Sequence, residues 1–585
     1  MAQRQFGPLV TDEGVTFRLW APTARRVDLV LDRTVAMTRG DGGWYTAHVG
    51  DAAAGTRYKF RIDDDLDIPD PASSFQPDDV FGAGEVINHD TYPWNPADWR
   101  GRPWHEAVIL EAHVGAFTPE GTFRAAIDKL DHLVDTGVTA LELMPLADFA
   151  GKRNWGYDGV LWYAPDSAYG RPEHLKALVD AAHQRGLMVL LDVVYNHFGP
   201  EGNYLGRYAP EFFTGAQTPW GSAIDFRRPE VRTFAIESAI GWLRDYRFDG
   251  LRVDAIHAIA EPGKTAILRE LSVAAGQLAE ASGRHIHLVL ENDGNTVALL
   301  DPGQPIPRGK YRAQWNDDYH HAWHVLLTGE THAYYRDYRI SPLQDIARAL
   351  GSGFVYQGEP SEHRGGTPRG ELSLALSPLA FINFVQNHDQ IGNRALGDRL
   401  ADKVEPRALE AALAILLLAP FVPMLFMGEE WGSARPFPFF CDFQGGLAEA
   451  VRAGRRKQFA AAYAGHDGEI PDPLDEATFR SAHLDWKTAE AGAGARRLKF
   501  VRDLLAVRRR EIVPRLAGAK FGMAQASEAG LLAADWQLGD GTRLSLMANL
   551  SRQQMAVALR DRGAPIWGQE LSGSLPPWAV IWRIE

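Results

Sequence analysis

The chain has 585 residues, of which 45% are hydrophobic and 23% charged, and its formal net charge is -14. This length exceeds one ordinary core and predicts about three or four structural units, fewer if one of them is a large barrel. The negative charge argues against a nucleic-acid partner, because the phosphate backbone would be repelled.

Cysteine content and the distribution of apolar residues exclude several other classes. Cys441 is the only cysteine, so an intrachain disulfide is impossible and a buried structural role is expected. The first residues, MAQRQFGPLVTDEG, lack the apolar core of a secretory signal, and a cytoplasmic location is therefore expected. The uncharged run 411–428 is long enough to cross a membrane, but Pro420 and Pro423 divide it. A buried helix followed by a buried strand is the better prediction, with no membrane partner.

Residues 1–90 have the pattern of a β-sandwich domain of the immunoglobulin-like kind. Short alternating runs such as VTFRLWAP and TRYKFRID are separated by turn-rich pieces such as RGDGG. Residues 91–105 are rich in proline and tryptophan, which predicts a linker without regular structure.

The periodicity of apolar residues changes in residues 106–513, where strand-like and helix-like runs alternate. Helix-like runs end at Gly137 and Gly186, where a helix C-cap favours positive φ. This alternation predicts an α/β fold, a (β/α)8 TIM barrel. The eight strand candidates are 107–114, 138–145, 187–194, 250–256, 286–292, 310–316, 380–387 and 423–429.

Two connections of this barrel, 195–227 and 316–379, are much longer than ordinary loops and predict insertions on the rim. A last helix ends in the basic run Arg508 to Arg510, which we expect to be solvated. Residues 514–585 return to short strands and predict a C-terminal β-sandwich domain.

Three carboxylates stand where predicted strands end: Asp254, Glu291 and Asp389. The carboxyl ends of barrel strands form the catalytic face of this fold. Arg252 lies two residues before Asp254, so both side chains point the same way, and we expect the guanidinium to keep Asp254 ionised as a nucleophile. A neighbouring carboxylate raises the pKa of Glu291, which suits a proton donor.

Two carboxyl groups with opposed roles are what retaining cleavage of a glycosidic bond requires. Asp389 is a third carboxylate able to bind sugar hydroxyls, and His197 and His388 are expected to donate hydrogen bonds to the same ring. Metal binding is the other interpretation of such a cluster, but Arg252 beside Asp254 would repel a cation.

Four segments, DVVYNH, GLRVDAIH, LVLEND and FVQNHDQIGN, resemble the four signature regions of the α-amylase superfamily of glycoside hydrolases. The resemblance implies that Asp254 is the nucleophile, Glu291 the acid/base and Asp389 the stabiliser of the transition state. It further implies substrate-binding roles in subsite −1 for Tyr157, Asp192, His197, Arg252 and His388.

Further stretches, among them EAHVGAFTPEGTF and QWNDDYHHAWHVLLTGE, resemble the malto-oligosyltrehalose trehalohydrolases within this superfamily. That resemblance implies hydrolysis of the α-1,4 bond next to a terminal trehalose. Malto-oligosyltrehalose would be the substrate, and trehalose and malto-oligosaccharides the products. A glycogen branching enzyme is an alternative, because it resembles this sequence in its N-terminal domain and all four regions. A glucan-binding protein without catalysis is another, which the intact carboxylates disfavour.

Residues of the rim insertions are expected to select the acceptor side. Trp220 offers a stacking face, and Arg364, Asn316 and Asp317 offer hydrogen bonds. Asn196 matches one position of the family's calcium site, but the rest of a carbonyl and carboxylate cage is not evident. We therefore expect no cofactor and no required metal, and a monomer is the working expectation.

Overall fold

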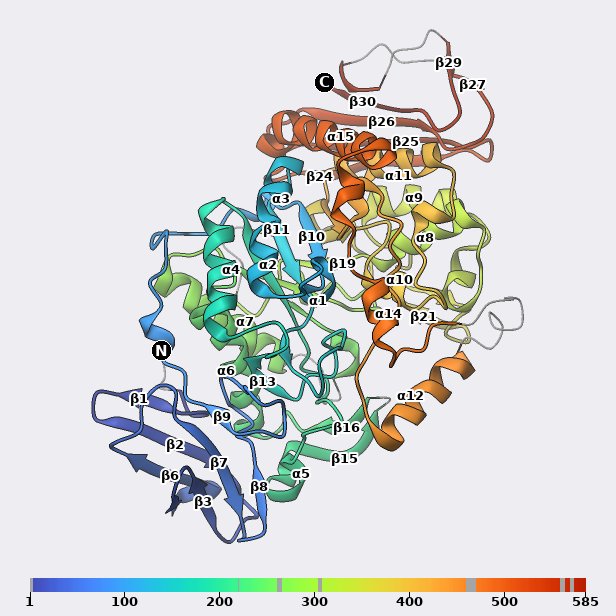
Figure 1. Cartoon of the computed structure of the whole chain (residues 1–585). Coiled ribbons are helices and arrows are strands. Elements are labelled where there is room, and N and C mark those ends of the chain that lie inside the picture. The colour runs from blue at the N-terminus through green and yellow to red at the C-terminus, as the bar shows by residue number, and fades with distance from the viewer. Residues whose placement is uncertain are drawn as a thin grey trace.

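A computed structural model describes residues 4–218, 220–259, 266–303, 308–458, 470–557, 563–568 and 573–585. Figure 1 shows a central barrel with the N-terminal strands at one end of the molecule and the C-terminal sheet at the other. The predicted fold class is confirmed: an α/β barrel lies between two antiparallel β domains.

The N-terminal domain contains two antiparallel sheets packed over an apolar core. Alternate residues of β2 (Gly14–Trp20), including Val15, Phe17 and Leu19, are buried, as the period of a half-buried strand requires. One sheet has the order β1 (Leu9–Thr11), β2, β6 (Trp44–Val49) and β5 (Thr38–Arg39). The other has the order β4 (Thr34–Ala36), β3 (Val27–Val30), β7 (Arg57–Ile62) and β8 (Leu66–Ile68), with β9 (Gly84–Glu85) also paired to β7.

Eight parallel strands close into a barrel within the described ranges, and each overlaps one of the predicted strands. All eight are fully buried runs, which is the pattern of strands covered on both faces. They are β10 (Ile109–Ala112), β11 (Ala140–Leu143), β14 (Met188–Val193), β17 (Gly250–Val253), β18 (His287–Leu290), β19 (Ala313–Trp315), β22 (Phe381–Asn383) and β23 (Val422–Phe426).

The helix predicted to end at Gly137 is broken into two shorter helices, whereas the helix predicted to end at Gly186 is continuous. Both glycines have positive φ, 101° and 73°. The helices between β10 and β22 are α1 (Val114–Phe117), α2 (Phe123–Ile127), α3 (Leu130–Thr136), α4 (Pro172–Gln184), α5 (Leu205–Tyr208), α6 (Pro229–Asp245), α7 (Ala266–Ser282), α8 (Asp317–Thr328) and α9 (Pro342–Ser352). Those that follow are α10 (His388–Gly392), α11 (Pro406–Leu418), α12 (Gly445–Gln458), α14 (Glu476–Ser481) and α15 (Gly492–Val507).

Each long connection carries its own structure. The first contains α5 and a hairpin of β15 (Phe213–Thr218) and β16 (Gly221–Ile224). The second contains α8, α9 and a hairpin of β20 (Glu359–Ser361) and β21 (Thr367–Arg369). Between β11 and β14, β12 (Ala147–Asp148) pairs with β13 (Leu161–Pro165).

The uncharged run 411–428 forms a buried helix and a buried strand, α11 and β23, as predicted. Across the described ranges, no helix has the length and apolar character needed to span a membrane. Cys441 is buried and free, as expected, and burial raises the pKa of its thiol to about 12.

The C-terminal domain is a five-stranded antiparallel sheet with an additional two-stranded ladder. The expectation that the run Arg508 to Arg510 is solvated was wrong for Arg508, whereas Arg509 and Arg510 are exposed. Arg508 is 1% exposed and donates to the carbonyls of Leu417 (3.0 Å), Ala419 (2.7 Å) and Phe421. The five-stranded sheet has the order β24 (Lys520–Ala526), β25 (Leu531–Gln537), β26 (Arg543–Asn549), β30 (Val580–Ile584) and β28 (Ala564–Trp567), and the ladder pairs β27 (Met555–Ala556) with β29 (Ser574–Leu575).

Candidate active site

One buried guanidinium organises the carboxyl ends of the barrel strands. Asp192 on β14 lies opposite Arg252 on β17 in the parallel register, and Arg252 Nη1 is 2.7 Å from Asp192 Oδ2. The same nitrogen is 2.8 Å from Asp254 Oδ1, and Nη2 is 2.9 Å from Glu291 Oε2. The Arg252 guanidinium also lies 4.0 Å from the centre of the Trp315 ring. Three carboxylates are therefore fixed around one cation.

Asp254 is held at both carboxylate oxygens. Arg252 contacts Oδ1, and the Asn196 amide donates to Oδ2 at 2.7 Å. Burial raises the pKa of Asp254 above its usual value, while Arg252 and Asn196 lower it. The expectation that Arg252 keeps this pKa low was wrong, because loss of hydration outweighs the cation.

Glu291 follows β18 and is positioned by a strained backbone. Ala255 has φ of 38°, in the left-handed region, and its N–H donates to Glu291 Oε2 at 2.7 Å. Such a conformation costs on the order of 1–3 kcal/mol for a residue other than glycine, so the surrounding structure must hold it. Burial raises the pKa of Glu291, Arg252 lowers it and Asp254 raises it. A raised pKa suits a group that must carry a proton.

Asp389 lies in the first turn of α10, beside a histidine that is charged at neutral pH. His388 Nε2 is 3.6 Å from Asp389 Oδ1, and His388 Nδ1 is paired with Glu111. Burial lowers the pKa of His388, but Glu111 and Asp389 outweigh it and raise this pKa to about 9. Burial also raises the pKa of Asp389, and His388 opposes that effect.

Two acidic residues of the barrel interior were not predicted from the sequence. Glu111 on β10 accepts the backbone N–H of His388 at 3.1 Å besides pairing with its ring. Glu142 on β11 is its neighbour in register, is 1% exposed and has no hydrogen-bond partner among the described residues. Burial, reinforced by Glu111, raises the pKa of Glu142 far above its usual value, which favours the protonated form.

Aromatic rings line one side of these carboxylates. The Tyr157 hydroxyl donates to Asp192 Oδ2 at 2.6 Å, and its ring stacks on His388 at 5.1 Å between centroids. Both ring nitrogens of His197 contact the protein, one at Asn196 Oδ1 and the other at the Tyr157 carbonyl. This differs from the predicted hydrogen bond between His197 and a sugar. Trp220, 48% exposed, lies nearly parallel to His197 at 5.9 Å.

Asn316 and Asp317, which were both predicted on the acceptor side, have different surroundings. Asn316 is fully buried, and its amide donates to the Gly353 carbonyl at 3.0 Å and to Asn383 Oδ1 at 2.9 Å, so it does not reach a ligand. Asp317 begins α8; burial raises its pKa far above the usual value, and Glu291 and Asp389 raise it further.

Arg364 is the other acceptor-side candidate that remains near the carboxylates. It lies in the turn between β20 and β21, and its Nη2 is 2.6 Å from Asp293 Oδ2, two residues after Glu291. The structure thus places Asp317 under the influence of Glu291 and Asp389, brings Arg364 to Asp293, and leaves Asn316 within the fold.

The residues around Asn196 do not fit the family's calcium site. Its amide nitrogen donates to Asp254, and its oxygen contacts the His197 ring. The described part of the chain holds no group of three or more His, Cys, Asp or Glu side chains that could bind a metal. The absence of a metal requirement stays a prediction.

Three family models match the chain in order. Residues 5–72 match carbohydrate-binding module 48 (isoamylase N-terminal domain), and residues 87–209 match the alpha amylase catalytic domain. Residues 521–582 match a domain of unknown function, DUF3459.

Relatives of known name cover most of the chain. The malto-oligosyltrehalose trehalohydrolase of Deinococcus radiodurans is 44% identical over 516 residues, covering 86% of this chain and 83% of that protein. A crystal structure of a candidate alpha amylase from Salmonella typhimurium is 44% identical over the whole of both chains, with a TM-score of 0.95. The branching enzyme GlgB of Mycobacterium tuberculosis is 36% identical over 42% of this chain and 37% of its own. The chain belongs to the α-amylase family of glycoside hydrolases, in the group that contains the malto-oligosyltrehalose trehalohydrolases.

Proposed function

We propose that this protein hydrolyses the α-1,4-glucosidic bond next to the terminal trehalose of malto-oligosyltrehalose, with retention of configuration, and releases trehalose. The observation that carries the chemistry is the Arg252 guanidinium, which holds Asp254 and Glu291 side by side at its two nitrogens. Retention requires two carboxyl groups about 5 Å apart, one to attack and one to transfer a proton. The high identity to trehalohydrolases over most of the chain supports the substrate.

In the first step, Asp254 attacks the anomeric carbon while Glu291 protonates the leaving glycosidic oxygen. Arg252 and Asn196 occupy one carboxylate oxygen each and orient Asp254 for this attack. Because burial raises the pKa of Glu291, this group keeps its proton until trehalose departs. The products of this step are a glycosyl ester on Asp254 and free trehalose.

In the second step, Glu291 takes a proton from water, which attacks the same carbon and releases the shortened malto-oligosaccharide. The sugar ring gains positive charge in both transition states, and we assign the stabilisation of this charge to the Asp389 carboxylate. His388, charged through Glu111 and Asp389, has its Nε2 directed toward Asp389 and orients that carboxylate.

The acceptor side must fit two glucose units joined through both anomeric carbons. We infer that Trp220 stacks on one of these units, because its ring is exposed and lies parallel to His197. Asp317 and Arg364 supply hydrogen bonds to hydroxyl groups from the other insertion.

A branching enzyme is the second candidate, favoured by the partial match to GlgB. The two functions differ in whether water or a sugar hydroxyl attacks the glycosyl ester. Incubation with malto-oligosyltrehalose, followed by proton NMR of the first products, tests the proposal. Free trehalose together with an α-anomeric reducing end supports it. New α-1,6 branch points, or an initial β-anomer, would disprove it.

A further inference from the structure

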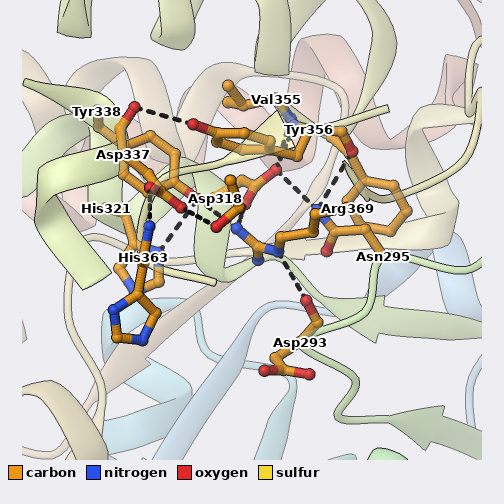
Figure 2. Close-up of polar contacts among 12 residues, drawn as sticks. Asp293, Asn295, Asp318, His321, Asp337, Tyr338, Val355, Tyr356, His363 and Arg369 are labelled. Atoms are coloured by element: carbon orange, nitrogen blue, oxygen red, sulfur yellow. Dashed lines mark hydrogen bonds and ion pairs between the residues drawn. The ribbon is translucent and has the colours of Figure 1, made fainter. Parts of the chain in front are cut away.

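The loop that follows Glu291 is tied to a buried ion pair on the second rim insertion (Figure 2). The backbone carbonyl of Asp293 accepts hydrogen bonds from Arg369 Nε at 2.7 Å and from Arg364 Nη2 at 2.9 Å. Asn295, whose φ is 51°, donates its side-chain amide to Asp318 Oδ2 at 2.8 Å. Two positions within four residues of Glu291 are therefore anchored to Arg369 and Asp318.

Asp318 is the centre of this arrangement. It is 0% exposed, follows Asp317 at the start of α8, and is 2.9 Å from Arg369 Nη1. Its carboxylate contacts donors from Asn295 (2.8 Å), Tyr338 (2.5 Å), the Val355 and Tyr356 backbones (2.7 and 2.9 Å) and Arg369 (2.9 Å). A buried carboxylate with so many donors has one fixed position.

Arg369 connects the loop after Glu291 to Asp318. Its Nε contacts the loop after Glu291, whereas its Nη1 contacts Asp318 and, at 2.8 Å, the Tyr338 hydroxyl. The planar guanidinium makes these contacts in different directions from one rigid group, and the residue is only 7% exposed. Figure 2 shows Arg369 between Asp318 and Asp293.

We propose that Arg369 is a positioning residue that sets the placement of Glu291 relative to Asp317, by clamping the loop after β18 to the start of α8. This inference rests on the proposed function of Glu291 as acid/base. Burial and, after it, the Glu291 carboxylate raise the pKa of Asp317. A displacement of Glu291 by about 1 Å would misalign proton transfer and lower turnover by up to ~10²-fold.

The test compares two substrates that differ in their need for Glu291. Malto-oligosyltrehalose needs a proton on its leaving oxygen. α-Maltotriosyl fluoride needs none, because Asp254 displaces fluoride at C1 directly and added azide then displaces Asp254 without a base. A defect confined to Glu291 therefore lowers the kcat for the first substrate and spares the second. A general structural defect lowers both.

We expect Arg369→Met to lower the kcat for malto-oligosyltrehalose about tenfold or more and to leave fluoride turnover in azide nearly unchanged. Arg369→Lys keeps the charge beside Asp318, but its single nitrogen cannot reach both partners, so we expect the same selective loss. The matched control is Arg348→Met, which breaks an exposed ion pair with Glu359 on the same insertion and should change neither rate.

The Glu291→Gln variant distinguishes a failure of the proposed role of Glu291 from a failure of the proposed role of Arg369. If Glu291→Gln lowers turnover of both substrates equally, or of neither, the proposed function of Glu291 fails. If Glu291→Gln shows the selective loss while Arg369→Met and Arg369→Lys behave like the wild type, or lose both activities together, the positioning role of Arg369 is overturned.

Discussion

Replacement of Glu111 by glutamine should change how the stability of this protein depends on pH. Glu111 is the main group that raises the pKa of the buried His388 to about 9, against an ordinary value of 6.5. A shift of this size corresponds to about 3 kcal/mol of folding free energy. Because the folded-state pKa is raised, this contribution is complete below pH 6.5 and is lost as the pH rises through 9.

In Glu111→Gln the His388 ring loses its closest anion, and burial then lowers the pKa of His388. Most of the contribution of His388 to the folding free energy should therefore disappear at pH 6. Thermal unfolding at pH 6 and at pH 10, at one scan rate, measures the effect. We expect the variant to unfold about 2 °C below the wild type at pH 6, with the gap closing by pH 10. Glu430→Gln, which removes a glutamate 3.2 Å from His132 on α3, is the matched control. An equal gap between Glu111→Gln and the wild type at both pH values would refute the reasoning.

Three further predictions concern the nucleophile, the buried Arg508 and metal ions. Asp254→Asn should lower turnover by more than about 10³-fold and retain glucan binding in affinity electrophoresis; substantial residual activity would remove Asp254 from its role. Arg508→Met leaves the carbonyls of Leu417, Ala419 and Phe421 without their donor, and each lost partner costs about 1–3 kcal/mol, so the midpoint of thermal unfolding should fall while kcat stays unchanged. Activity should survive EDTA, and a loss that Ca²⁺ restores would contradict this.

The barrel and its three carboxylates follow from local patterns, because strands covered on both faces are continuous apolar runs and their polar ends mark one rim. Glu111 could not be identified in this way. It stands inside such a run, and its partner His388 lies 277 residues away in the sequence. The same limit applies to Asn316 and Asp317, since adjacent polar residues after a strand give no sign of which one turns into the fold.

The predicted exposure of Arg508 was wrong for a related reason. A basic run at the end of a helix normally faces solvent, but here a π-helical segment, Arg508–Ile512, continues from α15. Arg508 then lies under the end of α11, where it satisfies carbonyls left without helical partners. Sequence periodicity does not reveal such a change of helical pitch.

The most direct test of the proposed function is the ratio of kcat/KM for malto-oligosyltrehalose to that for a malto-oligosaccharide with the same number of glucose units. The two substrates differ only in the linkage of the terminal pair, so the ratio isolates recognition of trehalose on the acceptor side. We predict a ratio of about five or more, with trehalose as the released product, because stacking and hydrogen bonds to one sugar pair contribute on the order of 1–3 kcal/mol. A ratio near one, or release of maltose from both substrates, would contradict the account.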